Sequence, residues 1–87
     1  MKITKKNGNI TLFDDEKIVA SILRANAETA ETLMDRKLAS AIADQVFLRL
    51  TVSSEIITTG DVRRCVDALL REKGFAETAR HYMEYSK

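Results

Sequence analysis

The sequence contains no proline, three glycines, one cysteine and one histidine among its 87 residues. Because so few residues that break helices are present, we predict a mostly helical chain that is interrupted near Gly8, Gly60 and Gly74. The single cysteine, Cys65, excludes an internal disulfide. One cysteine and one histidine, His81, also cannot provide the four ligands of a structural zinc site.

An excess of one charge and a long apolar run are missing as well. Lysine and arginine number 14 against 13 acidic residues, which gives a formal net charge of +1. Nothing global therefore points to nucleic acid or an anionic membrane as a partner. No run is long enough to span a bilayer and no signal-peptide pattern is present, so we expect a cytoplasmic protein. The length and the hydrophobic share of 45% predict one small globular domain over residues 1–87.

The signatures of common catalytic and phosphate-binding sites are absent too. The chain has no GxxxxGKS/T loop, no GxGxxG, no GxSxG and no HExxH. Cys65 falls on an apolar helical stripe and is interpreted as a core thiol. His81 has no partner nucleophile and is interpreted as a surface or packing residue. The pair Asp14–Asp15 could suggest a metal site, but helix capping explains both residues more simply. We therefore do not expect an enzyme.

The N-terminal segment predicts a β-hairpin. Residues 2–13 read KITKKNGNITLF, in which Asn7-Gly8 is a strong signal for a two-residue turn between strands. We place the strands at roughly residues 2–6 and 9–13. Because an isolated hairpin is marginally stable, it needs a third strand and packing helices.

Capping residues and apolar spacing divide the rest of the chain into helices and one short strand. We expect a first helix from an Asp14 cap to Ala27 or Thr29, an ambiguous stretch at 28–34, and a second helix from an Asp35 cap through Leu50. A loop at 51–57 follows, with a short strand at Glu55–Thr58. A Thr58–Asp61 capping box then starts a third helix that ends at Gly74, and a fourth helix has Phe75, Ala79, Tyr82 and Met83 at helical spacing. The predicted fold is α+β: a small, mostly helical domain of about four helices capped by an N-terminal β-hairpin with a short third strand.

The hairpin is also the most charge-biased part of the chain. Lys2, Lys5 and Lys6 occur with no acid before Asp14, and Lys17 follows one turn into the next helix. A helix N-terminus with free N–H groups and nearby lysines can hold a phosphate chain. Lysines on an edge strand also commonly serve only to deter aggregation, and the residue pattern alone favours that explanation.

Residues 3–18, ITKKNGNITLFDDEKI, resemble the opening of an ATP-cone domain, and further motifs follow along the chain. The matching motifs are KKNG at 5–8, FD at 13–14, KI at 17–18, TTGDV at 58–62, EKGF at 72–75 and ARHYMEY at 79–85. Each motif is modest by itself, but their order and spacing over essentially the whole chain are specific for this family.

The resemblance implies a helical bundle capped by a three-stranded sheet, with ATP or dATP bound beneath the hairpin. Mg²⁺ can accompany the nucleotide with few protein ligands. The residues implied at this site are Lys5, Lys6 and Lys17 at the phosphates, Ile3 and Ile18 near the base or sugar, Thr59 and Arg63 at the start of the third helix, Lys87 from the last helix, and Asp14 as cap, contact or both. Lys6 and Ser86 stand where arginine is frequent in this family, so affinity or nucleotide choice could differ.

The resemblance also implies a regulatory role. ATP-cone domains control ribonucleotide reductases and the transcription of reductase genes: ATP leaves the reductase active, whereas dATP shifts its oligomeric state and inhibits it. The chain shows neither a catalytic barrel nor zinc-ribbon cysteines, so we expect an excised domain or a free-standing cone. Its expected partners are an adenine nucleotide and either further copies of itself or a parent reductase or regulator.

Two alternative functions stay open. A degenerate cone could act as an oligomerisation or partner-docking module without nucleotide sensing, which Lys6 and Ser86 permit. A nucleic-acid-binding module could use the basic residues of the third helix, Arg63, Arg64, Arg71 and Lys73. The interleaved Asp67 and Glu72 instead indicate a solvated helix face, so direct nucleic-acid binding is not expected.

Overall fold

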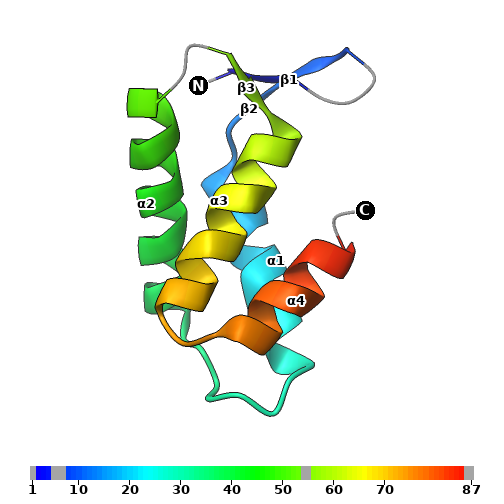
Figure 1. Ribbon diagram of the computed structural model, residues 1–87, viewed down its shortest axis with the longest axis vertical. Helices are drawn as coiled ribbons and strands as arrows, with labels where there is room; N and C mark the ends of the chain where they lie inside the picture. The colour runs from blue at the N-terminus through cyan, green and yellow to red at the C-terminus, as the bar shows by residue number, and fades with distance from the viewer. Residues whose placement is uncertain (1, 5–7, 54–55, 86–87) are drawn as a thin grey trace.

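Short strands and longer helices follow one another in the order that the breakers and caps predict. The computed structural model of the protein describes residues 2–4, 8–53 and 56–85. Within these ranges the elements are β1 (Lys2–Thr4), β2 (Ile10–Leu12), α1 (Asp15–Ala27), α2 (Arg36–Ser53), β3 (Ile57–Thr58), α3 (Thr59–Glu72) and α4 (Ala76–Tyr85) (Figure 1). This order confirms the predicted α+β fold, in which four helices are joined to a small three-stranded sheet.

The sheet has β1 at its centre, in the order β2-β1-β3. Ile3 of β1 lies opposite Thr11 in an antiparallel pairing and opposite Ile57 in a parallel one. The predicted hairpin and third strand are therefore confirmed. The described strands β1 and β2 have three residues each, shorter than the predicted 2–6 and 9–13. Residues 5–7 and Glu55 lie outside the described residues, and Gly8 has the positive φ of 85° that favours glycine.

Three helices begin at side chains that cap them, as the sequence predicts. The carboxylate of Asp14 accepts hydrogen bonds from the backbone N–H groups of Glu16 (3.1 Å) and Lys17 (3.4 Å) at the start of α1. The carboxylate of Asp35 accepts from the backbone N–H of Leu38 (2.8 Å) at the start of α2. A capping box with both of its hydrogen bonds starts α3; its members are Thr58 and Asp61.

The sequence predicts the C-terminal ends of the helices less accurately than their starts. Gly74, directly after α3, has a φ of 87° and is confirmed as the residue that ends this helix. The ambiguous stretch 28–34 is a loop. The predicted end of the second helix at Leu50 was wrong, because α2 continues to Ser53. The Thr51 hydroxyl donates to the carbonyl of Phe47 (2.7 Å), a bond that lets a β-branched residue stay within a helix.

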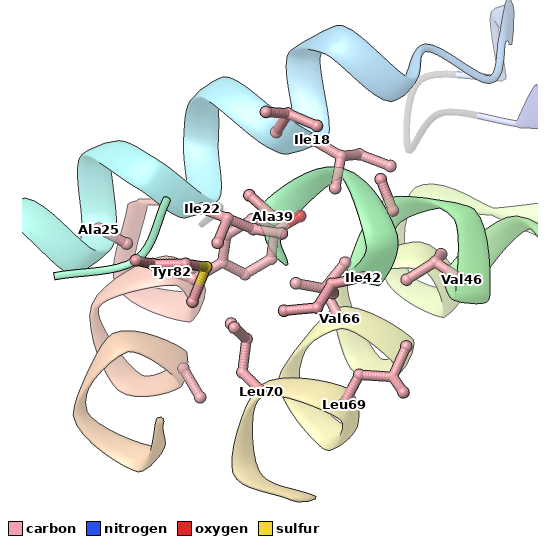
Figure 2. Packing of buried hydrophobic residues seen from close by; sticks show 14 of the residues in the cluster. Ile18, Ile22, Ala25, Ala39, Ile42, Val46, Val66, Leu69, Leu70 and Tyr82 are labelled. Carbon is pink, nitrogen blue, oxygen red and sulfur yellow. The ribbon is translucent and has the colours of Figure 1, made fainter. Parts of the chain in front are cut away.

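Apolar side chains from all four helices meet in one core (Figure 2). The labelled members are Ile18, Ile22 and Ala25 from α1, Ala39, Ile42 and Val46 from α2, Val66, Leu69 and Leu70 from α3, and Tyr82 from α4. The sheet closes one end of this bundle and extends the core through the buried Ile3 and Ile57. No helix in the described ranges is long and apolar enough to cross a membrane.

A buried polar group joins the helices at the end opposite the sheet. Asn26 of α1 is 2% exposed. Its amide nitrogen donates to the Thr32 carbonyl and to the Thr78 hydroxyl, both at 3.1 Å, and its amide oxygen accepts from the backbone N–H of Met34 at 2.8 Å. One side chain thus fixes the loop 28–35 and α4 against α1.

Glu31, from the same loop, caps α4. Its carboxylate accepts from the backbone N–H groups of Glu77 (3.2 Å) and Thr78 (2.7 Å) and from the Thr78 hydroxyl (2.7 Å). Burial opposes ionisation of this carboxyl, but the hydrogen bonds from Thr78 and Glu77, together with the nearby His81, outweigh it and lower the pKa of Glu31. The cap of α4 therefore comes from a loop far away in the chain.

We predict that Asn26→Ala destabilises the protein. The substitution leaves the buried Met34 N–H without its partner, which costs about 1–3 kcal/mol, and it also removes the bond to the part-buried Thr32 carbonyl. Urea unfolding followed by circular dichroism measures the loss. Lys37→Ala, on the exposed side of α2, is the control and should stay within about 0.5 kcal/mol of the unsubstituted protein. An equally small effect of Asn26→Ala would contradict the structural role of this amide.

Glu31 predicts a specific acid sensitivity. Because the pKa of Glu31 is lower in the folded protein than its ordinary value of 4.5, its contribution to stability is complete above pH 4.5 and is lost as the pH falls through the folded-state pKa. Glu31→Gln should be less stable than the unsubstituted protein at pH 7, and the difference should shrink on acidification. Unfolding curves measured across this pH range test the prediction; a difference that is constant with pH would exclude it.

Candidate functional site

A pocket of about 770 Å³ lies where the hairpin meets the first turns of α1 and α3. Its described lining consists of Ile3, Ile10, Thr11, Leu12, Phe13, Asp14, Lys17, Ile18, Thr59, Val62, Arg63 and Tyr82. This volume falls in the range of about 300–1,000 Å³ that is common for small-molecule sites. The pocket is therefore large enough for a ligand of nucleotide size.

The pocket brings together most of the residues that the sequence predicts for a nucleotide site. The predicted residues in its wall are Ile3, Asp14, Lys17, Ile18, Thr59 and Arg63. Lys5, Lys6 and Lys87 lie outside the described residues, so their contacts with the nucleotide stay predictions. Residues more than 40 positions apart in the sequence, such as Lys17 and Arg63, thus share one wall.

The sheet explains how these distant residues meet. Ile3 pairs with Ile57, and the next residue of β3, Thr58, is also the cap of α3. Thr59 therefore enters the pocket directly after the strand, and Arg63 follows one helical turn later. On the other side β2 ends at Leu12 and α1 begins at Asp15, which places Asp14 and Lys17 beneath the hairpin strands.

Positive charge dominates the polar part of the pocket. Among the described lining residues, Lys17 and Arg63 are cations and Asp14 is the acid. The Asp14 carboxylate is already engaged by two backbone N–H groups of α1. No ion pair joins Lys17 or Arg63 to another residue within the part of the chain that the structure describes. Their charges are therefore available to an anionic ligand.

The start of α3 adds to this positive potential. The N-terminus of a helix carries a partial positive charge, and Thr59, the first residue of α3, lies at the pocket wall, although the capping box already engages the N–H groups of Thr58 and Asp61. Hydrogen bonds from Thr58, and then the neighbouring Arg64, lower the pKa of Asp61, so this acid is ionised at neutral pH. Arg64 forms an exposed ion pair with the Asp61 carboxylate at 2.5 Å. Arg63 therefore lines the pocket, whereas the adjacent Arg64 pairs with Asp61.

The other part of the pocket is apolar. Ile3, Ile18 and Tyr82 are buried, while Phe13 and Val62 are half-buried. Sequence reasoning did not assign Phe13, Val62 and Tyr82 to the site. The apolar spacing of α3 and α4 identified Val62 and Tyr82 only as core positions. The pocket thus has an apolar wall suited to a ring system beside a cationic wall suited to phosphate.

Residues that could serve other chemistry lie elsewhere. Cys65 is half-buried against the core, and burial raises the pKa of its thiol. It lines a separate, apolar hollow beside Leu48 and Val52. His81 is half-buried, with its Nδ1 3.7 Å from a carboxylate oxygen of Glu28. Both findings agree with the predicted packing roles. No group of three metal-ligating side chains occurs among the residues with described positions.

Comparison with known proteins identifies the family of the chain. Two curated relatives match, both described as a vitamin B12-dependent ribonucleoside-diphosphate reductase, from Mycobacterium tuberculosis strains CDC 1551 / Oshkosh and ATCC 25618 / H37Rv. Each is 31% identical over 86 residues, which is 97% of this chain but only 12% and 11% of the respective relative. The chain therefore spans a small part of the length of these relatives. The ATP cone domain family matches residues 1–87, and the chain belongs to this family.

Proposed function

We propose that this chain is a non-catalytic module that binds ATP or dATP in the pocket beneath the hairpin and thereby regulates a ribonucleotide reductase or a related regulator. The observation that carries the proposal is the convergence of Lys17, Arg63 and Thr59 beside an apolar wall in a member of the ATP cone domain family. Domains of this family are regulatory and bind ATP or dATP in general. The two reductase relatives support a reductase as the parent protein.

The pocket suggests how the nucleotide would lie. The triphosphate would meet Lys17 and Arg63, the cations among the described lining residues, near the start of α3. Lys5 and Lys6, which follow β1 in the sequence, and Lys87 are proposed to add further charge. The adenine ring or the sugar would lie against Ile3 and Ile18, which supply the apolar surface that such a ring covers.

A magnesium ion would depend mainly on the nucleotide. Asp14 is the acid among the described lining residues of the pocket, and its carboxylate caps α1. Mg²⁺ commonly binds through phosphate oxygens and water with one or two carboxylates. The residues present therefore fit an ion that enters with the phosphates, to which Asp14 contributes at most one ligand.

Substitution of the cationic residues tests the site. Lys17→Ala and Arg63→Ala should each weaken ATP and dATP binding by about 1.5–3 kcal/mol, because each removes a charged hydrogen bond to phosphate. Titration calorimetry measures the affinities. Arg64→Ala is a matched control on the same helix turn: Arg64 pairs with Asp61, does not line the pocket and should retain the affinity.

Two results would contradict the proposal. The first is the absence of binding by the unsubstituted protein at millimolar ATP and dATP. The second is unchanged affinity in both Lys17→Ala and Arg63→Ala, with circular dichroism showing an intact fold. The second result would exclude the proposed position of the phosphates while leaving nucleotide binding itself in place.

A second candidate function is self-association or partner docking without nucleotide sensing. Phe47, Leu48 and Val52, here called the outer α2 face, are 37%, 61% and 88% exposed. Apolar side chains that cluster on a surface are typical of contact sites. Sedimentation velocity with and without nucleotide separates the two functions. Assembly that responds to ATP or dATP supports the sensing module, and assembly that ignores both nucleotides favours the second function.

A further inference from the structure

The junction between β2 and α1 belongs to the pocket and to the contact with α2 at the same time. Phe13 lies between the two elements and lines the pocket. Its ring also packs against the ring of Phe47 on α2, with 5.4 Å between the ring centroids and an interplanar angle of 55°. Phe47 does not line the pocket. One side chain therefore connects the pocket wall to the outer α2 face.

The first turn of α1 likewise borders both the pocket and α2. Asp14, Lys17 and Ile18 face the pocket. The neighbouring residues face α2: Asp15 meets Asp44, and Glu16 pairs with Arg36. A shift of this turn toward a ligand would therefore change its contacts with α2 as well.

The contacts between this turn and α2 are partly opposed to one another. The tilted aromatic pair is attractive, at about 0.5–1.5 kcal/mol. Asp15 and Asp44 place two carboxyl groups together; burial, followed by this contact with Asp44, raises the pKa of Asp15. The ion pair between Glu16 and Arg36 is exposed to solvent and contributes little. Because the attractive aromatic pair and the two adjacent carboxyl groups oppose each other, a modest additional interaction can change the position of the turn.

We propose that the first turn of α1 transmits occupancy of the pocket to the outer α2 face through the contact between Phe13 and Phe47. The inference rests on the proposed function, because the ligand is the nucleotide. Phosphates that bind Lys17 pull on the first turn from the pocket side. Phe13, one residue before the cap, moves with the turn and alters the environment of Phe47. Phe13 and Phe47 are thus positioning residues that link the pocket to the exposed helix.

Linkage between the two places gives the first test. Because the proposed coupling runs through the ring of Phe47, removing that ring should change nucleotide affinity although Phe47 lies outside the pocket. We expect Phe47→Ala to change the Kd for ATP by about fivefold or more, the lower range of measured couplings. Leu48→Ala, at the next and more exposed residue of α2, which lines the separate hollow beside Cys65, should leave the Kd unchanged. Equal Kd values for both variants and the unsubstituted protein would overturn the inference.

A spectroscopic test reads the same contact directly. The chain contains two tyrosines but no tryptophan, so Phe47→Trp introduces a single indole beside Phe13 whose emission can be excited selectively over that of tyrosine. ATP should shift its emission with the same saturation curve that calorimetry gives. Leu33→Trp, on the exposed loop 28–35 at the far end of the bundle, should show no shift. In Phe47→Trp with Phe13→Leu, the shift should be lost at nucleotide concentrations that calorimetry shows to be saturating for that variant.

The outcomes separate this inference from the proposed function. If calorimetry shows ATP binding but the emission at position 47 does not change, the transmission is excluded and the nucleotide site stands. If the unsubstituted chain binds no ATP, both proposals fail. Amide chemical shifts of residues 47–52 in the unsubstituted protein provide the same test without a substitution. Shifts that follow ATP support the transmission, and unchanged shifts at saturation exclude it.

Discussion

The parallel pairing of β1 with β3 is the contact on which the pocket depends. Two residue pairs form it among the residues that the structure describes, Ile3 with Ile57 and Thr4 with Thr58. It nevertheless joins the beginning of the chain to the start of α3, and it does so with Ile3 and Ile57 both buried in the core. Because Thr58 is at once the end of the strand and the cap of α3, the pairing also sets where the helix begins. This contact, together with the packing of α3 in the shared core, therefore fixes Thr59 and Arg63 relative to Lys17.

The opposite end of the bundle supports the same pocket from a distance. Asn26 and Glu31 hold Thr78 at the start of α4 through direct hydrogen bonds. Tyr82 lies one turn further along the same face of α4 and lines the pocket. On α1 the buried residues Ile18, Ile22 and Asn26 likewise occupy one stripe from the pocket to the polar end. The polar group at one end and the sheet at the other therefore fix α1 and α4, two of the three helices that line the site. Because close-packed side chains move little independently of one another, fixing the helices at the polar end also fixes their pocket ends.

Local signals made most of the fold predictable. Asp14, Asp35, the Thr58–Asp61 box and Gly74 each act within a few residues of themselves, so the sequence alone locates the helix ends that they define. The extension of α2 to Ser53 escaped prediction, because the β-branched residues there favour strand locally while the buried Leu50 and the preceding turn continue the helix. The structural roles of Asn26 and Glu31 could not be predicted for another reason. Their partner Thr78 is 52 and 47 positions away, and no local sequence pattern indicates such a contact. The same holds for the site, where the motifs mark Lys17, Thr59 and Arg63, but only the packing reveals that Phe13, Val62 and Tyr82 share their pocket.

The construction of the pocket bears on why such a domain suits regulation. Its wall combines β1 and β2, two helix starts and α4, so a bound ligand contacts most of the elements of a chain of 87 residues. A ligand at a hundred times its Kd stabilises the state that binds it by about 2.7 kcal/mol. Small domains are stable by only about 5–15 kcal/mol in total, so this contribution is a large fraction of what holds the elements together. A ligand that binds across the junction of sheet and helices shifts the populations of their arrangements to the extent that it binds one arrangement more tightly than another. The first turn of α1, which contacts the pocket on one side and α2 on the other, is the part of the structure where such a shift reaches the surface.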